Sequence, residues 1–276
     1  MRASTILILA SRELRAAMRG RWFLMGSILF GLLAIAVSQL GMAGSRGWGI
    51  SAADRTAAAL LNLVLLFVPL LGIPLGASSF AKEKEDGTLG YLIAQPARRS
   101  EVFTGKLAGL ILAITLTLGI GFGLAAVWVG LRGAIASETF WAMAFAAWLL
   151  GFFSVSLGVL FASITQNSLQ ALALSIGAWV VLVFLCDFGV LALAAAQILG
   201  PGAIFAISIA NPLQAVKTLI ALSISHRLEV LGPAGVHAVQ VLGSTGLLAV
   251  LISSIAVWTF AVIETGYLRF RKENFI

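Results

Sequence analysis

The sequence predicts an all-α, polytopic membrane protein with six transmembrane helices. Of its 276 residues, 60% are hydrophobic and only 11% are charged, whereas ordinary soluble domains contain about 25% charged residues. Apolar segments of about 20 residues recur along the chain, and each is long enough to cross a hydrocarbon core of about 30 Å. A transmembrane β-barrel would instead require short segments of alternating polarity, which the sequence lacks. Composition and segment length therefore both indicate a helical membrane protein.

The positions of five spans follow directly from the apolar segments. The first four are expected at 22–43, 56–80, 107–131 and 140–164. The sixth is expected at 239–263. The remaining segment, 169–211, has Asp187 as its only charge and is much longer than the roughly 20 residues that one crossing needs. Either a fifth span continues to about residue 199 and outer-surface helices follow, or the span ends at Asp187 and re-entrant segments follow. The sequence leaves this choice open for 188–210.

The region 200–238 is expected to hold an outer loop and outer helices. Gly200-Pro201-Gly202 and Asn211-Pro212 are turn signals. The segment 212–222, which contains Lys217, is expected to form an amphipathic surface helix. His226 and His237 then fall in a polar outer loop.

The distribution of positive charge predicts how the chain is oriented. Residues 1–21 carry five arginines against one acid, Glu13, and are expected to form an amphipathic helix in the membrane interface. Thirteen of the 18 Lys and Arg residues lie in this stretch, in the 82–106 loop and in the C-terminal tail. The positive-inside rule therefore predicts that both termini and the 82–106 loop are cytoplasmic. The same rule accounts for the net charge of +7, so no nucleic-acid partner is expected.

The loop 82–106, KEKEDGTLGYLIAQPARRSEVFTGK, is the main polar interruption of the apolar sequence. Gly87-Thr88 offers a break and a side-chain cap. Leu89, Leu92 and Ile93 recur at helical spacing, and Pro96 is expected to end the helix. The pattern favours a short amphipathic helix at the membrane surface over a solvated loop whose charges only fix the topology.

Catalysis by this chain is not expected. The single cysteine, Cys186, and the two histidines provide neither a metal motif nor a catalytic constellation. Gly105-Lys106 superficially matches the end of a phosphate-binding loop, but Ser100 stands where that loop needs glycine, and Leu107 stands where it needs Ser or Thr. We therefore expect no catalytic residue, metal or cofactor in this chain. If ATP drives the protein, another subunit must hydrolyse it.

The loop resembles the first cytoplasmic loop of type 2 ABC-transporter permeases, with a departure at Ala97-Arg98. The resemblance covers the whole loop, and the six-span layout extends it along the chain as one permease domain, 1–276. It implies a coupling helix that sits on a separate nucleotide-binding subunit. The residues that it assigns to ATPase coupling are Glu83, Glu85, Asp86, Gly87, Thr88, Leu89, Leu92, Pro96, Arg99 and Lys106. The implied partners are two copies of an ABC ATPase carrying ATP and Mg²⁺, a second copy of this chain, and the lipid bilayer.

A narrower resemblance involves the opening Arg12-Glu13-Leu14-Arg15, the segment from Arg19 to Trp22, and Asn211-Pro212. These features are similar to those of permeases that serve multicopper-enzyme maturation, notably that of nitrous oxide reductase, and they imply a periplasmic accessory protein. The alternatives are an export permease for another substrate and an anchor that acts mechanically on an outer partner without moving cargo. A channel or secondary transporter is less favoured, because ionisable residues within the spans are few.

Overall fold

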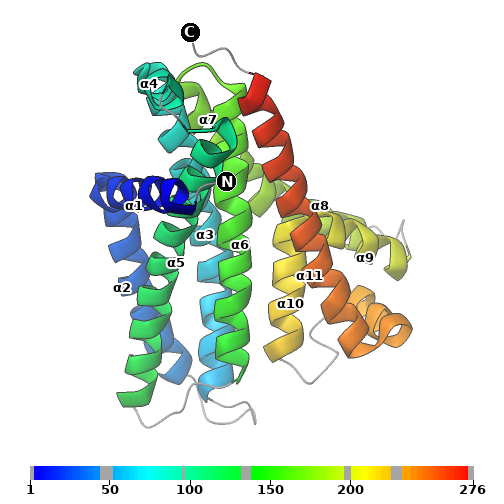
Figure 1. Ribbon diagram of the computed structural model, residues 1–276. Helices are drawn as coiled ribbons and strands as arrows, with labels where there is room; N and C mark the ends of the chain where they lie inside the picture. The colour runs from blue at the N-terminus through cyan, green and yellow to red at the C-terminus, as the bar shows by residue number, and fades with distance from the viewer. Residues whose placement is uncertain are drawn as a thin grey trace.

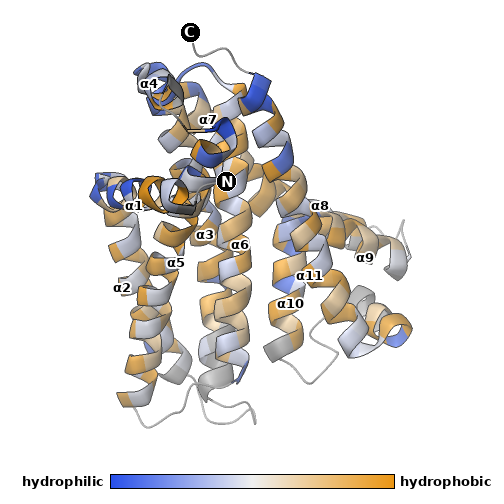
Figure 2. Cartoon of the chain, in the orientation of Figure 1, coloured by the Kyte–Doolittle hydropathy of each residue, from blue (hydrophilic) through white to orange (hydrophobic). Residues whose placement is uncertain are grey.

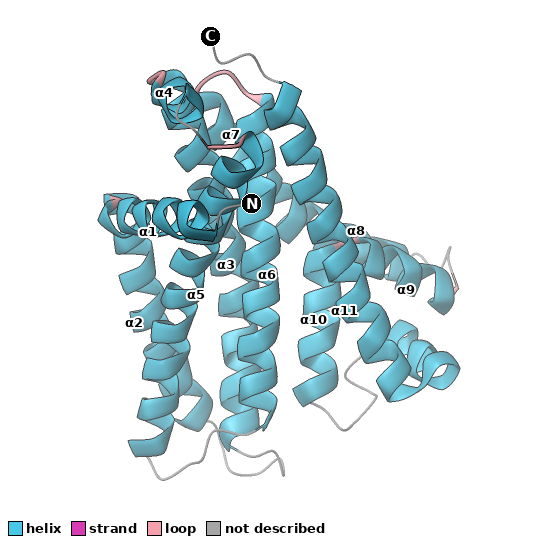
Figure 3. Cartoon of the chain, viewed as in Figure 1, coloured by secondary structure: helices cyan, strands magenta, loops and turns pink. Residues whose placement is uncertain are grey.

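The computed structural model describes residues 3–43, 52–94, 97–131, 138–195, 200–224 and 232–272. Within these ranges every regular element is a helix (Figure 3). The elements are α1 (Ala3–Arg19), α2 (Arg21–Ala43), α3 (Ala52–Glu85), α4 (Thr88–Ala94), α5 (Arg99–Leu131), α6 (Glu138–Ile164), α7 (Ser168–Val180), the π-helical segment η1 (Val181–Leu185), α8 (Cys186–Ala195), α9 (Pro201–Ala210), α10 (Pro212–Ile224) and α11 (Gly232–Lys272).

Six described helical segments are long and apolar enough to cross a membrane. They are Arg21–Gly41, Ala59–Glu85, Arg99–Leu131, Glu138–Ile164, Ser168–Val190 and Ala238–Lys272. The predicted all-α, multi-pass membrane architecture is thereby confirmed. Hydrophilic residues gather at the end of the bundle that carries α1, α4 and the end of α11 (Figure 2). We call this end the α4 end.

The centre of the bundle is the contact between α3 and α6. A Cβ added to Gly158 would overlap the carbonyl oxygen of Ile73, and one added to Gly76 would overlap that of Val155. Glycine at these positions lets the two backbones touch, which is how small residues promote association of membrane helices. Pro69 and Pro74 both lie inside α3.

The helix α1 lies across the bundle rather than along it (Figure 1), as expected of an interfacial helix. It crosses α5 at Gly105 and Gly109, where an added Cβ would lie 2.8 Å from the Cβ of Leu9 and 2.5 Å from the carbonyl oxygen of Ala10. Gly119 and Gly123 of α5 also have the spacing of a helix-packing pair, but a Cβ added at either position would meet no described atom within 4 Å.

The long fifth apolar segment matches neither alternative in full. Helical structure continues from Ser168 through η1 to Ala195, so Asp187 does not end the helix. Beyond it, α8 and α9 run sideways from the bundle (Figure 1). The expected turns are present, because α9 begins at Pro201 and α10 at Pro212, and the Asn211 side chain accepts a hydrogen bond from the Leu213 backbone N–H at 3.0 Å.

The prediction that 212–222 is a surface helix is wrong. Residues along α10 are buried against α6, α9 and α11: Leu213, Ala215, Val216, Leu219 and Ile220. The amphipathic pattern of the segment reflects one face covered by protein, and Lys217 on the other face pairs with Asp187 of α8 at 2.7 Å. The histidine at 226 lies outside the described residues, as does the side chain of His237.

Both ends of the expected 82–106 loop are helical. The helix α3 continues five residues past the predicted end of the span, to Glu85, and α5 begins at Arg99 instead of Leu107. The charged residues 82–85 therefore extend α3 beyond the apolar span. The apolar pattern alone predicts a shorter helix. At the other end of the chain, α11 reaches from Gly232 to Lys272 and contains a kink at Gly243, where φ is 71°.

Candidate functional site

A tight turn separates α3 from α4 at the α4 end. Gly87 adopts φ of +70°, a left-handed conformation that glycine reaches without steric cost and that commonly terminates helices. The Thr88 hydroxyl donates a hydrogen bond to the carbonyl oxygen of Glu83 at 3.2 Å. The break and the side-chain cap predicted at Gly87-Thr88 are both present, and the hydroxyl caps the end of α3 rather than the start of α4.

The short helix α4 has seven residues and two contrasting sides. Leu89 is 2% exposed and Leu92 is half-buried, both packed against the protein's own core. The burial of Leu89 holds α4 against the bundle. Tyr91 is 78% exposed. The side chain of Ile93 and all of Pro96 lie outside the described residues, although α4 does end just before Pro96, at Ala94.

Behind α4, a buried lysine connects α1, α3 and α5. Lys106 of α5 is 1% exposed, and its Nζ lies 2.6 Å from Glu13 Oε2 and 3.0 Å from Glu83 Oε2. The Ser79 hydroxyl donates to the other oxygen of Glu13, and Arg12 pairs with Glu83 at 3.1 Å. We call these five residues the Lys106 network. Because a buried charge is tolerated only when it is paired, the network fixes how α1 crosses α3 and α5.

An aromatic cluster surrounds the same lysine and extends the connection to α11. The Nζ of Lys106 lies 4.8 Å from the centre of the Phe80 ring, within the range of a cation–π contact. Phe103 and Phe270 pack against Phe80 and each other, with ring centres 5.6–6.0 Å apart. Arg99 also donates to the carbonyl oxygen of Arg271 at 2.6 Å. The start of α5 and the end of α11 are thereby joined beside α4.

The final turn of α3 is tied to the connection between α6 and α7. Glu85 accepts hydrogen bonds from the Ser168 backbone N–H at 2.9 Å and from the Ser168 hydroxyl at 2.5 Å. Lys84 donates to the carbonyl oxygen of Thr165 at 2.6 Å. A carboxylate at the first turn of α7 satisfies a backbone N–H that the helix leaves without a partner. The base of α4 is therefore anchored to the connection between α6 and α7.

Three acids in this turn were expected to face a partner, and the structure separates them. Glu83 and Glu85 are engaged within the chain. Asp86 is exposed, and its carboxylate makes no hydrogen bond or ion pair with any described residue. The exposed surface of the α4 region includes Asp86 and Tyr91, together with Glu85, Gly87 and Thr88. Glu83, Glu85, Thr88, Leu89, Arg99 and Lys106 make the contacts that hold the region in place.

The contacts around α4 are structural ones that join several helices at this end of the bundle. In the described parts of the chain, no group of three or more His, Cys, Asp or Glu residues could hold a metal ion. What the residues do provide is a short exposed helix on a rigid base that contacts α1, α3, α5, α7 and α11. A force applied to α4 would reach the spans directly.

A comparison with protein families identifies the family of this chain. The family described as ABC-2 family transporter protein matches residues 7–275. The chain belongs to this family. The permease is similar to the probable ABC transporter permease protein NosY of Stutzerimonas stutzeri, with 32% identity over 190 residues, 67% of this chain and 69% of that protein. It is 30% identical over 190 residues to the protein of the same name from Pseudomonas aeruginosa, with the same coverage. It is therefore an ABC permease, the membrane subunit of a transporter.

Sequence reasoning named Lys106 for its place in the loop motif but missed the partners that it binds. The signal was a lysine that opens an apolar span, together with Glu13 as the lone acid of a basic helix. A lysine in that position requires a counter-ion if it is buried. Glu13 is a candidate for that counter-ion, because it is the one acid in the basic segment 1–21. The exposed aromatic residue of α4, Tyr91, was also missed because it breaks no helical pattern.

Proposed function

We propose that α4 is the coupling helix on which a separate ABC ATPase acts, with the permease working as a homodimer bound to two ATPase subunits that carry ATP and Mg²⁺. The observation that carries the proposal is the exposed α4 on its anchored base. In this arrangement both termini and α4 are cytoplasmic, and the membrane is a bacterial inner membrane. The positive charge gathered in α1, the α4 region and the end of α11 supports that orientation.

The mechanism follows from the connections of α4. Closure of two ATPase subunits would push on Tyr91 and Asp86. Because the base of α4 is tied to α3, α5 and α7, the push would rotate these helices as one body. Rigid-body rotation of this kind is an established way to switch between two states. The Lys106 network would carry the same motion to α1.

For the cargo, we propose that the permease serves the maturation of a periplasmic copper enzyme, such as nitrous oxide reductase, together with a periplasmic accessory protein. The support is the similarity to the two permeases named NosY and the resemblance of the N-terminal helix to permeases of this group. Two alternatives remain: export of another substrate, and mechanical action on an outer partner without movement of cargo. Transport measurements would distinguish both from the proposed role.

Replacing Tyr91 by aspartate should weaken ATPase binding about tenfold or more, while expression and membrane insertion stay normal. Tyr91 is 78% exposed, so the substitution removes no internal packing, and exposed tyrosines are enriched among the residues that dominate binding energy. The measurement is co-purification of the cognate ATPase with tagged permease, followed by ATP hydrolysis of the complex in nanodiscs.

Two variants control this experiment. Tyr91→Phe keeps the ring and should retain the ATPase. Lys272→Asp places the same new side chain at the exposed described end of α11, outside α4, and should also retain it. If Tyr91→Asp co-purifies with undiminished ATPase and supports full hydrolysis, α4 is not the contact.

A further inference from the structure

A cleft of about 440 Å³ lies between α1, the start of α2 and the end of α3, at the α4 end of the bundle. Its lining combines basic, acidic and hydroxyl groups with two aromatic residues that begin α2: Arg12, Lys82, Glu83, Asp86, Ser78, Ser79, Trp22 and Phe23 are among them. Trp22 is 66% exposed, and tryptophan is enriched where lipid headgroups meet the hydrocarbon. The cleft is therefore placed at headgroup level.

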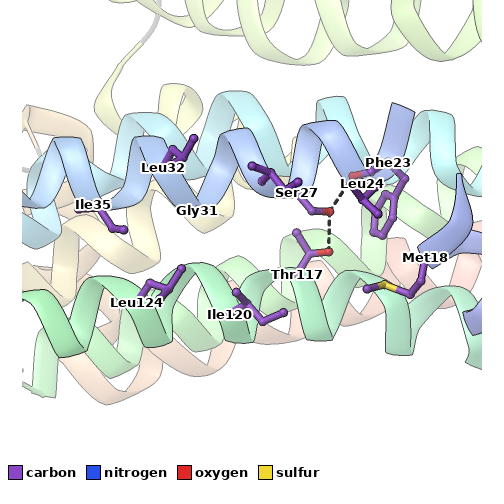
Figure 4. A pocket seen from close by; sticks show the side chains of 11 residues that line it. Met18, Phe23, Leu24, Ser27, Gly31, Leu32, Ile35, Thr117, Ile120 and Leu124 are labelled. Atoms are coloured by element: carbon purple, nitrogen blue, oxygen red, sulfur yellow. Dashed lines mark hydrogen bonds between the residues drawn. The ribbon is translucent and has the colours of Figure 1, made fainter. Parts of the chain in front are cut away.

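Two apolar grooves leave this cleft, one on each side of α2. The first, of about 270 Å³, lies between α2 and α5 and shares Phe23 with the cleft. Figure 4 shows its side chains, with the hydrogen-bonded pair Ser27 of α2 and Thr117 of α5 lying between Phe23 and Gly31. The second, of about 430 Å³, lies between α2 and α3 and shares Trp22 with the cleft. Ile28 and Leu32 line both grooves.

The length of the grooves corresponds to one leaflet. On α2 the first groove extends from Phe23 to Ile35, which is about 18 Å along a helix that rises 1.5 Å per residue. Half of a hydrocarbon core of about 30 Å is about 15 Å. Two apolar channels of leaflet depth that meet at a polar cleft have the shape of two acyl chains below one headgroup.

The cleft also offers a cation for a phosphate. Two positive charges balance the carboxylates of Glu13 and Glu83: buried Lys106, which contacts both, and Arg12, which pairs with Glu83. Lys82 is exposed, and its ammonium forms no ion pair with any described residue. Lys82 therefore offers a ligand a positive charge, in a cleft that is also lined by the carboxylate of Asp86.

From this continuity and charge we propose that the permease binds one glycerophospholipid from the leaflet nearest α1. The two acyl chains straddle α2, and the phosphate sits in the cleft on Lys82 with support from Arg12. The lipid fills the space between α1 and the spans on which it lies. This site does not depend on which cargo the permease carries or on what drives it.

The test is native mass spectrometry of the intact permease in a mild detergent, with phosphatidylethanolamine, phosphatidylglycerol or phosphate-free diglucosyl-diacylglycerol added. We expect one phospholipid per permease chain with either headgroup, and no comparable retention of the glycolipid. Lys82→Gln should lower phospholipid retention about fivefold, which is the contribution of one basic residue at a lipid surface. Gly31→Phe should lower it further by filling the first groove, since a Cβ at Gly31 contacts only the Leu124 side chain, at 3.6 Å.

Matched variants exclude general effects of charge and bulk. Lys272→Gln removes a positive charge from the same end of the molecule, and Gly123→Phe adds the same ring to an open face of α5; both should bind phospholipid as the unmodified permease does. Equal retention of the glycolipid, or unchanged retention in both Lys82→Gln and Gly31→Phe, would overturn the proposal. Melting curves of all four variants, recorded without added lipid, identify any that is misfolded.

Discussion

Replacing Lys106 by methionine should destabilise the permease by roughly 3–5 kcal/mol, the usual result of removing one partner from a buried ion pair. Methionine keeps the length of the side chain and most of its packing, but it leaves Glu13 buried without a counter-ion. Glu83 loses its contact at 3.0 Å and retains only Arg12. The expected observation is a large fall in the melting temperature of detergent-solubilised protein and a loss of monodisperse material.

A second substitution distinguishes the lost charge pair from lost packing. Adding Glu13→Leu to Lys106→Met removes both charges from the 2.6 Å contact, and it should recover part of the stability, because replacing a whole buried ion pair by apolar groups is often neutral. Lys272→Met, at an exposed position, should change nothing. A Lys106→Met protein that melts like the unmodified permease would show that the network contributes no stability.

The sequence was most informative where the cause of a structure is local. Apolar length alone located the spans, because a bilayer imposes one thickness on every helix that crosses it. The break before α4 was also predictable, since Gly87 supplies the left-handed conformation within the turn itself. Similarly, Asn211 and Pro212 mark a helix start, because the Asn211 side chain accepts a hydrogen bond from the backbone N–H two residues later.

Features that depend on distant parts of the chain were not predictable in the same way. The periodicity of Leu89 and Leu92 shows that one side of α4 is apolar, but it does not say whether a partner or the protein's own core covers that side. The same ambiguity misplaced α10 at the surface. Lys106 and Glu13 are 93 positions apart, so their contact exists only because α1 folds back across α5.

Glycine pairs illustrate the limit most sharply. Gly119 and Gly123 have the spacing of a helix-packing motif, yet a Cβ at either would meet no described atom within 4 Å. Gly76 and Gly158 lie in separate helices and allow the central contact. Spacing along one helix cannot identify which face meets a neighbour. Only the arrangement of α3 against α6 reveals which glycines are indispensable.

Replacing Gly158 by leucine should therefore prevent assembly of the bundle. Its Cβ would overlap the carbonyl oxygen of Ile73 and lie 2.8 Å from the Ala77 backbone nitrogen. Both obstacles are backbone atoms of α3, so no side-chain rotation relieves them, and α3 and α6 must separate along their most intimate contact. The cost should reach or exceed the upper end of the 1–3 kcal/mol or so that overpacking a core typically causes.

The measurement is the yield of monodisperse permease after extraction, with the melting temperature of whatever remains soluble. Gly123→Leu is the matched control: it makes the same change in a membrane helix at a position with open space, and it should be neutral, because leucine has the higher helix propensity. Gly158→Ala adds only the overlapping atom and should already be strongly destabilising. Normal yield and melting of Gly158→Ala would mean that α3 and α6 lie farther apart than their backbones do in this structure.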